Sequence, residues 1–158
     1  MVRDCETLII RHPREKLAKC SLLGLEERPD LHFVQFEREE PPRCDGSLLL
    51  GFEGPRLSRA DRDRPLLLID GTWRLAGRIM RGWAGHIEAA EPRSIPSDWV
   101  TAYPRRQPDC PAPSRGLASV EALFIAYFLT GRAVDGLLEH YHWKDEFLEL
   151  NRARLGVR

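Results

Sequence analysis

The sequence LLLIDGTWRLAGRIM, residues 66–80, decides the predicted fold. Its first four residues, 66–69, are all aliphatic, and the absence of polar alternation is typical of a strand buried on both faces. Thr72 then fits as the N-cap of an amphipathic helix. Because open α/β sheets bind ligands beyond the carboxyl ends of their strands, Asp70 to Trp73 is the candidate site of chemistry. A simpler alternative is that Asp70 caps the helix and Trp73 belongs to the core.

Length and composition favour one globular domain. The chain has 158 residues, of which 42% are hydrophobic and 30% charged, enough to bury a substantial core. No apolar run approaches the roughly 20 residues of a membrane span, so we expect a soluble, cytoplasmic protein with no membrane partner. The cysteines are scattered without a CxxC pair, which disfavours structural zinc and a disulfide framework; they are Cys5, Cys20, Cys44 and Cys110.

Positive charge gathers in the middle of the chain. The formal net charge is zero, but 21 of the 24 basic residues are arginines. Residues 54–116 contain 11 arginines and 7 acidic residues, a difference of +4. Arginine binds phosphate bidentately and stacks on bases, so this part of the chain is suited to nucleic acid. A general preference for arginine over lysine explains the bias equally well.

The remaining elements follow from apolar periodicity and turn residues. Strands are predicted over residues 6–10, 32–36 and 47–52. A buried helix is predicted over residues 119–129, ending at Gly131, with further helices over residues 134–140 and around Phe147. Residues 86–89 fit either a short strand or an extended loop. Strands followed by helices predict an α/β fold with a helical C-terminal third.

Three smaller features remain open or carry no site. Ser21 fits either an N-cap or a hydroxyl that lines a pocket. The proline-rich loop 104–116 is a candidate to cover a ligand or contact RNA. Glu139, His140 and His142 share no helical face and have no second cluster of ligands, so we predict no metal site.

Three separated strings occur in order: IDGTW at residues 69–73, LASVEA at 117–122 and HWKDEFLELN at 142–151. Together they resemble the superfamily of DTW-domain proteins and ribosomal small-subunit RNA aminocarboxypropyltransferases. The first is similar to the D-x-S/T-W signature, the second to an LS(S/T)-x-EA helix start and the third to an F-K-W-G-x-x-F-L-x-x-N tail. Residues 93–104 also resemble R-x-L-P-x-L-V-A-A-N-P, and residues 50–61 resemble LSP…LSxxD.

The resemblance implies a single-domain, SPOUT-like α/β fold with a mostly parallel central sheet and a C-terminal trefoil knot. Residues 1–53 would form an N-terminal α/β part and residues 54–158 the SPOUT-like cofactor-binding part. It also implies transfer of the 3-amino-3-carboxypropyl group of S-adenosylmethionine to N3 of a uridine or pseudouridine in rRNA or tRNA. The alternatives are a SPOUT-like RNA methyltransferase and a non-catalytic cofactor-binding or RNA-binding module.

The same resemblance implies a set of cofactor-binding residues: Ser21, Leu50, Trp73, Ala76, Ile95, Ser114, Leu117 and Ser119. Trp73 and Ala76 would surround the methyl group, so that the adjacent methylene carbon faces the RNA base. Asp70 is the one carboxylate placed to accept the N3 proton or to orient the base. With structured RNA as the partner, we expect phosphate contacts from Arg11, Arg14, Arg74, Arg78, Arg105 and Arg106.

The central motif and the tail indicate different RNA substrates. Gly71 stands where the ribosomal branch usually has cysteine, which brings the motif closer to the tRNA-acting branch. The tail at residues 142–151 is closer to the ribosomal branch. The sequence therefore does not choose between rRNA and tRNA.

Overall fold

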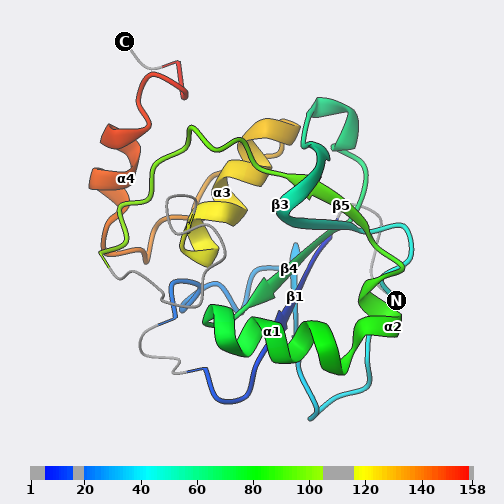
Figure 1. Ribbon diagram of the computed structural model, residues 1–158. Helices are drawn as coiled ribbons and strands as arrows, with labels where there is room; N and C mark the ends of the chain where they lie inside the picture. The colour runs from blue at the N-terminus through cyan, green and yellow to red at the C-terminus, as the bar shows by residue number, and fades with distance from the viewer. Residues whose placement is uncertain (1–5, 16–19, 105–115, 157–158) are drawn as a thin grey trace.

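The computed structural model describes residues 6–15, 20–104 and 116–156 (Figure 1). A five-stranded sheet with the order β2-β1-β4-β3-β5 forms its centre, and every neighbouring pair is parallel. The strands are β1 (Thr7–Arg11), β2 (Leu31–Gln35), β3 (Leu48–Arg56), β4 (Leu66–Asp70) and β5 (Glu91–Ser94). The predicted α/β fold with a parallel central sheet is confirmed.

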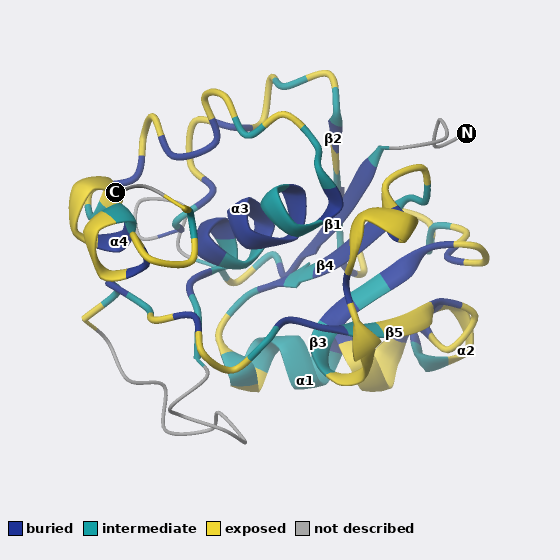
Figure 2. Cartoon of the chain, turned by 90° about the horizontal axis from the view of Figure 1, so that it is seen from above, coloured by how far each residue is buried: buried dark blue, intermediate teal, exposed yellow. Residues whose placement is uncertain are grey.

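Helices cover both faces of this sheet. They are α1 (Trp73–Gly82), α2 (Ala84–Ile87), α3 (Ser119–Thr130) and α4 (Lys144–Leu150), with a short 3-10 turn η2 (Arg59–Asp61). In Figure 2 the strands β1, β4 and β3 run between α3 on one side and α1 with α2 on the other. Among the residues that the structure describes, no helix is long and apolar enough to cross a membrane.

The aliphatic run in β4 is buried on both faces, as predicted. Leu66 and Leu68 join the core cluster that contains the apolar residues of α3. Leu67 points the other way and joins the cluster of Ile79 on α1. Successive side chains of a strand alternate between faces, so an uninterrupted apolar run serves a strand packed between two helical layers.

Two helix ends predicted from single residues are also confirmed. Thr72 Oγ1 accepts a hydrogen bond from the Leu75 amide at 3.3 Å, which caps the start of α1. At the other end of the fold, Gly131 follows α3 with a φ of 77°. A left-handed residue at this position is the usual way to end a helix, and glycine adopts it without steric cost.

Two predicted segments have a different structure. Residues 86–89 form neither strand nor extended loop, because Ala84–Ile87 is the short helix α2, with Ile87 buried in the α1-side cluster. The adjacent strand is β5, which begins only at Glu91. The helix predicted over residues 134–140 is absent: residues 135–140 form successive turns, since Gly136 has a φ of 79° that interrupts the helical backbone.

Candidate functional site

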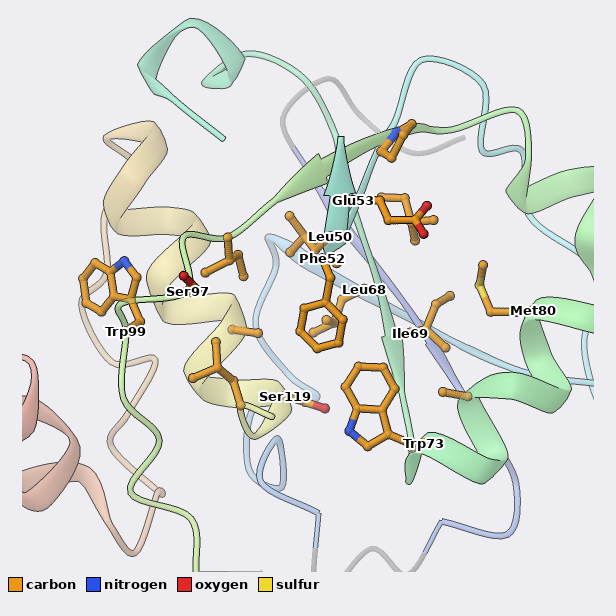
Figure 3. Close-up of a pocket in the computed structure, with 18 of the residues that line it drawn as sticks. Leu50, Phe52, Glu53, Leu68, Ile69, Trp73, Met80, Ser97, Trp99 and Ser119 are labelled. Carbon is orange, nitrogen blue, oxygen red and sulfur yellow. The ribbon is translucent and has the colours of Figure 1, made fainter. Parts of the chain in front are cut away.

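A cavity of about 580 Å³ lies beside β3 and the carboxyl end of β4 (Figure 3). This volume lies within the range of small-molecule sites, roughly 300–1,000 Å³. Its lining is almost entirely apolar and comes from five parts of the chain: Leu49, Leu50, Gly51, Phe52 and Glu53 of β3; Leu68, Ile69 and Gly71; Trp73, Ala76 and Met80 of α1; Pro92, Ile95, Pro96, Ser97 and Trp99; and Leu117, Ser119 and Ala122.

Six of the eight predicted cofactor-binding residues line this one cavity: Leu50, Trp73, Ala76, Ile95, Leu117 and Ser119. They arrive from β3, α1, the segment after β5 and the start of α3, so only the folded chain brings them together. Ser114 lies outside the described residues. Ser21 is described but is not among the lining residues.

Trp73 provides a flat aromatic wall. Its ring stacks on that of Phe52, with centroids 5.2 Å apart and planes inclined by 26°. Figure 3 shows both rings among the cavity side chains, and Trp73 is only partly buried. The alternative that Trp73 belongs to the core is therefore wrong.

Beneath the cavity lies a buried polar network centred on Asp70. Arg11 Nε donates to Asp70 Oδ2 at 3.0 Å, and the Cys20 thiol donates to the same oxygen at 3.3 Å. Ser119 Oγ donates to Asp70 Oδ1 at 2.8 Å. Asp70 is only 2% exposed, so its carboxylate joins β1, the Cys20 turn and the start of α3 inside the protein.

The ionisation of the network's basic and thiol members follows from their surroundings. Burial alone would lower the pKa of Arg11, but the neighbouring Cys20, Asp70 and Glu26 raise it. Burial, followed by the negative charge of Asp70, raises the pKa of Cys20 to about 12. The guanidinium thus stays charged and the thiol stays protonated, which is the form that donates to Asp70.

This network corrects three expectations. Asp70 does not cap α1, because Thr72 does, and its carboxylate is absent from the cavity lining. A buried carboxylate engaged by three donors is poorly placed to take a proton from a nucleobase directly. Arg11 is 6% exposed and paired with Asp70, so it is not available as a phosphate contact.

The wall around α3 depends on two further side chains. Ser21 Oγ accepts a hydrogen bond from the Val120 amide at 3.0 Å, so Ser21 satisfies the first turn of α3 from a distant segment rather than lining the pocket. Glu121 is fully buried and accepts from Thr101 Oγ1 at 2.6 Å and from the Ala102 amide at 2.8 Å. Burial raises the pKa of Glu121. These contacts fix the chain after Trp99 against α3.

Three of the predicted phosphate contacts gather outside the cavity. Arg14 and Arg74 are exposed, and Arg78 is partly exposed. Burial is the main reason that the pKa of His12 is lowered, and the nearby positive charges of Arg14 and Arg78 lower it further. Arg14 and Arg78 therefore lie close together around His12, with Glu37 as an acidic neighbour, and Arg74 is one helical turn from Arg78. Arg105 and Arg106 lie outside the described residues.

Several site residues were not predicted from sequence. Phe52 and Glu53 line the cavity from β3, and Cys20 bonds to Asp70. Phe52 was predicted as part of the strand over residues 47–52, but nothing in the sequence of that strand marked it as a cavity residue. Within the described ranges, no group of three His, Cys, Asp or Glu side chains could hold a metal ion.

Comparison with known proteins identifies the fold. The chain matches no family model and no curated protein. Among solved structures it resembles the SAM-dependent rRNA:acp-transferase Tsr3 from Vulcanisaeta distributa, with a TM-score of 0.68 and 20% sequence identity. The alignment covers 96% of this chain and 82% of that one. The two chains therefore share a fold across nearly the whole sequence.

Replacing Arg11 by methionine tests the buried pair. Removal of one partner leaves a buried charge uncompensated, so we expect R11M to lower the free energy of unfolding by about 3 kcal/mol. The double variant R11M/D70N should recover a large part of that loss, because the stranded carboxylate is gone. Urea denaturation followed by circular dichroism measures both. The control R43M removes an exposed ion pair with Asp45 and should leave the midpoint unchanged; equal effects of R11M and R43M would contradict this account.

Proposed function

We propose that this protein is an S-adenosylmethionine-dependent RNA 3-amino-3-carboxypropyltransferase that modifies N3 of a uridine or pseudouridine. The observation that carries the proposal is the convergence of Leu50, Trp73, Ile95 and Ser119 on one cavity. The shared fold with a solved rRNA:acp-transferase supports the same reaction. The proposal includes a single domain over residues 1–158, a C-terminal trefoil knot, and action on rRNA or tRNA in the cytoplasm.

The cavity suits the proposed cofactor in size and chemistry. Its volume of about 580 Å³ accommodates a nucleoside with an amino acid side arm. When bound, S-adenosylmethionine supplies a carbon atom activated by the adjacent sulfonium. Trp73 and Ala76 would shield the methyl group, while Leu50, Ile95 and Leu117 would hold adenine and ribose. The protein then accelerates transfer mainly by positioning, because a sulfonium is already a good leaving group.

Ser119 is a polar residue of the cavity lining, and the buried network around Asp70 orients its hydroxyl group. Its hydroxyl hydrogen is committed to Asp70 Oδ1 at 2.8 Å, which leaves the oxygen lone pairs as acceptors. Ser119 lines the cavity, whereas Asp70 does not. We therefore assign Asp70 the role of a positioning residue that orients Ser119 toward an N–H donor such as the ammonium group of the cofactor.

A double-label assay tests the reaction. The protein is incubated with RNA and with S-adenosylmethionine labelled either in the carboxyl group or in the methyl group. Carboxyl label is expected in RNA and methyl label is not, because the transferred group carries the amino acid arm. Transfer of methyl label alone would establish a methyltransferase, and transfer of neither label would favour a binding module without catalysis.

The variants S119A and D70N test the positioning role. S119A removes one hydrogen bond to a charged ligand, so we expect about tenfold weaker cofactor binding with little change in kcat. D70N should also weaken binding, because an amide can donate to Ser119 Oγ and occupy its lone pairs. Calorimetric titration and steady-state kinetics separate the two constants, and S119T should restore binding. A fall in kcat with unchanged cofactor affinity would instead assign Asp70 a part in proton transfer.

The basic surface formed by Arg14, Arg74 and Arg78 is proposed to hold the RNA backbone. α1 carries Arg74 and Arg78 on its outer side and Trp73 on the side of the cavity, and Arg14 lies near Arg78 after β1, so RNA bound along α1 would place a base near the cofactor. Phosphate contacts of this kind are independent of sequence and release counterions.

The double variant R14A/R78A should weaken RNA binding and make it less sensitive to salt. Loss of two phosphate contacts is expected to reduce the slope of log K against log salt concentration by about 2 for duplex RNA. Fluorescence anisotropy at several salt concentrations measures the slope. R43A, in an exposed pair with Asp45, serves as the control. An unchanged slope in R14A/R78A would exclude this surface as the RNA contact.

A further inference from the structure

Glu53 places a negative charge in the lining of the cavity. Among the described residues that line the cavity, Glu53 alone has an ionisable side chain, and its neighbours there are aliphatic, aromatic, methionine, glycine, proline or serine. In the view of Figure 3, the Glu53 carboxylate lies above Phe52, and Trp73 and Ser119 lie below Phe52. The described lining thus offers one negative charge and no positive one.

Glu53 is exposed to solvent where it lines the cavity, so its charge is partly screened by water and salt. Its field on a bound ligand acts across the apolar lining, where screening is weaker than in bulk water. Trp73 and Phe52 stack on each other, and their outer faces carry the negative side of the aromatic quadrupole, which attracts cations. The carboxylate and the rings therefore both favour a positively charged ligand.

We propose that Glu53 makes this cavity selective for a ligand with a net positive charge. This inference rests on the proposed function. S-adenosylmethionine has a sulfonium, an ammonium and a carboxylate, which gives it one net positive charge. S-adenosylhomocysteine lacks the sulfonium methyl group and is neutral overall. Glu53 is then a specificity-determining residue that favours the sulfonium over the thioether.

The selectivity has a consequence for turnover. In the proposed reaction a bond forms between N3 of the base and the side-arm carbon, while the bond from that carbon to sulfur breaks. The electron pair of the broken bond stays on sulfur and the N3 proton passes to water. The remaining nucleoside, 5′-methylthioadenosine, is a neutral thioether. It has no positive charge for the Glu53 carboxylate to attract, so the loss of charge on sulfur favours its release.

Calorimetric titration with two ligands tests the role of Glu53. The protein and its E53Q variant are titrated with S-adenosylmethionine and with S-adenosylhomocysteine, which differ by one methyl group and one charge. E53Q should weaken S-adenosylmethionine binding about five- to tenfold and leave S-adenosylhomocysteine within about twofold. In the unmodified protein, the preference for S-adenosylmethionine should shrink as salt rises from about 0.05 M to about 0.5 M.

Two control variants separate an effect of charge from other effects of substitution. E53D keeps the charge and should keep the preference; E40Q removes a charge outside the cavity lining and should change neither affinity. If E53Q weakens both ligands equally, Glu53 contacts a group that they share and charge selection is wrong. If E53Q changes neither, Glu53 has no role in binding. If the unmodified protein binds neither ligand, the proposed function itself fails.

Discussion

The structure depends on the ion pair between Arg11 and Asp70. The two residues are register partners at the ends of β1 and β4, and their side chains meet at 3.0 Å. By the alternation of strands, Asp70 follows Leu68 on the face covered by α3, which brings its carboxylate to Ser119. One buried pair therefore fixes two central strands and the start of α3, and two of these elements, β4 and α3, also line the cavity.

The cost of this arrangement explains its extra partners. A buried ion pair rarely repays its desolvation unless its remaining hydrogen-bonding positions are filled. Here the Cys20 thiol and the Ser119 hydroxyl fill positions on Asp70, and the Arg11 guanidinium lies 4.6 Å from the centre of the Phe33 ring. The network is thereby rigid, and rigidity beneath a cavity keeps the Ser119 hydroxyl in one orientation. Stability and ligand positioning have the same physical source.

Local patterns in the sequence predicted what local forces determine. The two-faced burial of residues 66–69, the Thr72 cap and the Gly131 terminus each depend on neighbours in the chain, and all three are present. The helix predicted over residues 134–140 from apolar spacing was wrong, because the positive φ of Gly136 breaks the helical backbone. The motif resemblance found six of the nineteen residues that line the cavity.

The errors at the site come from long-range contacts. Arg11 stands in a polar stretch after a predicted strand, and this position suggested an exposed cation. In the structure Arg11 is paired with Asp70, which is 59 residues away in the sequence. The N-cap predicted at Ser21 was wrong for its own segment, which forms turns; the Ser21 hydroxyl instead accepts from the Val120 amide of α3, 99 residues away. A short stretch of sequence cannot predict such pairings, because they form only when distant segments pack together.

The helix α1 shows how a short chain can combine two binding surfaces. A helix repeats every 3.6 residues, so Trp73, Ala76 and Met80 share the cavity side while Arg74 and Arg78 lie four residues apart on another. Thr72 fixes where the helix starts, and it follows Asp70 by only two residues. The buried pair therefore sets the position of both faces at once. In the proposed enzyme, the distance between cofactor and RNA backbone is determined by the width of a single helix anchored at Asp70.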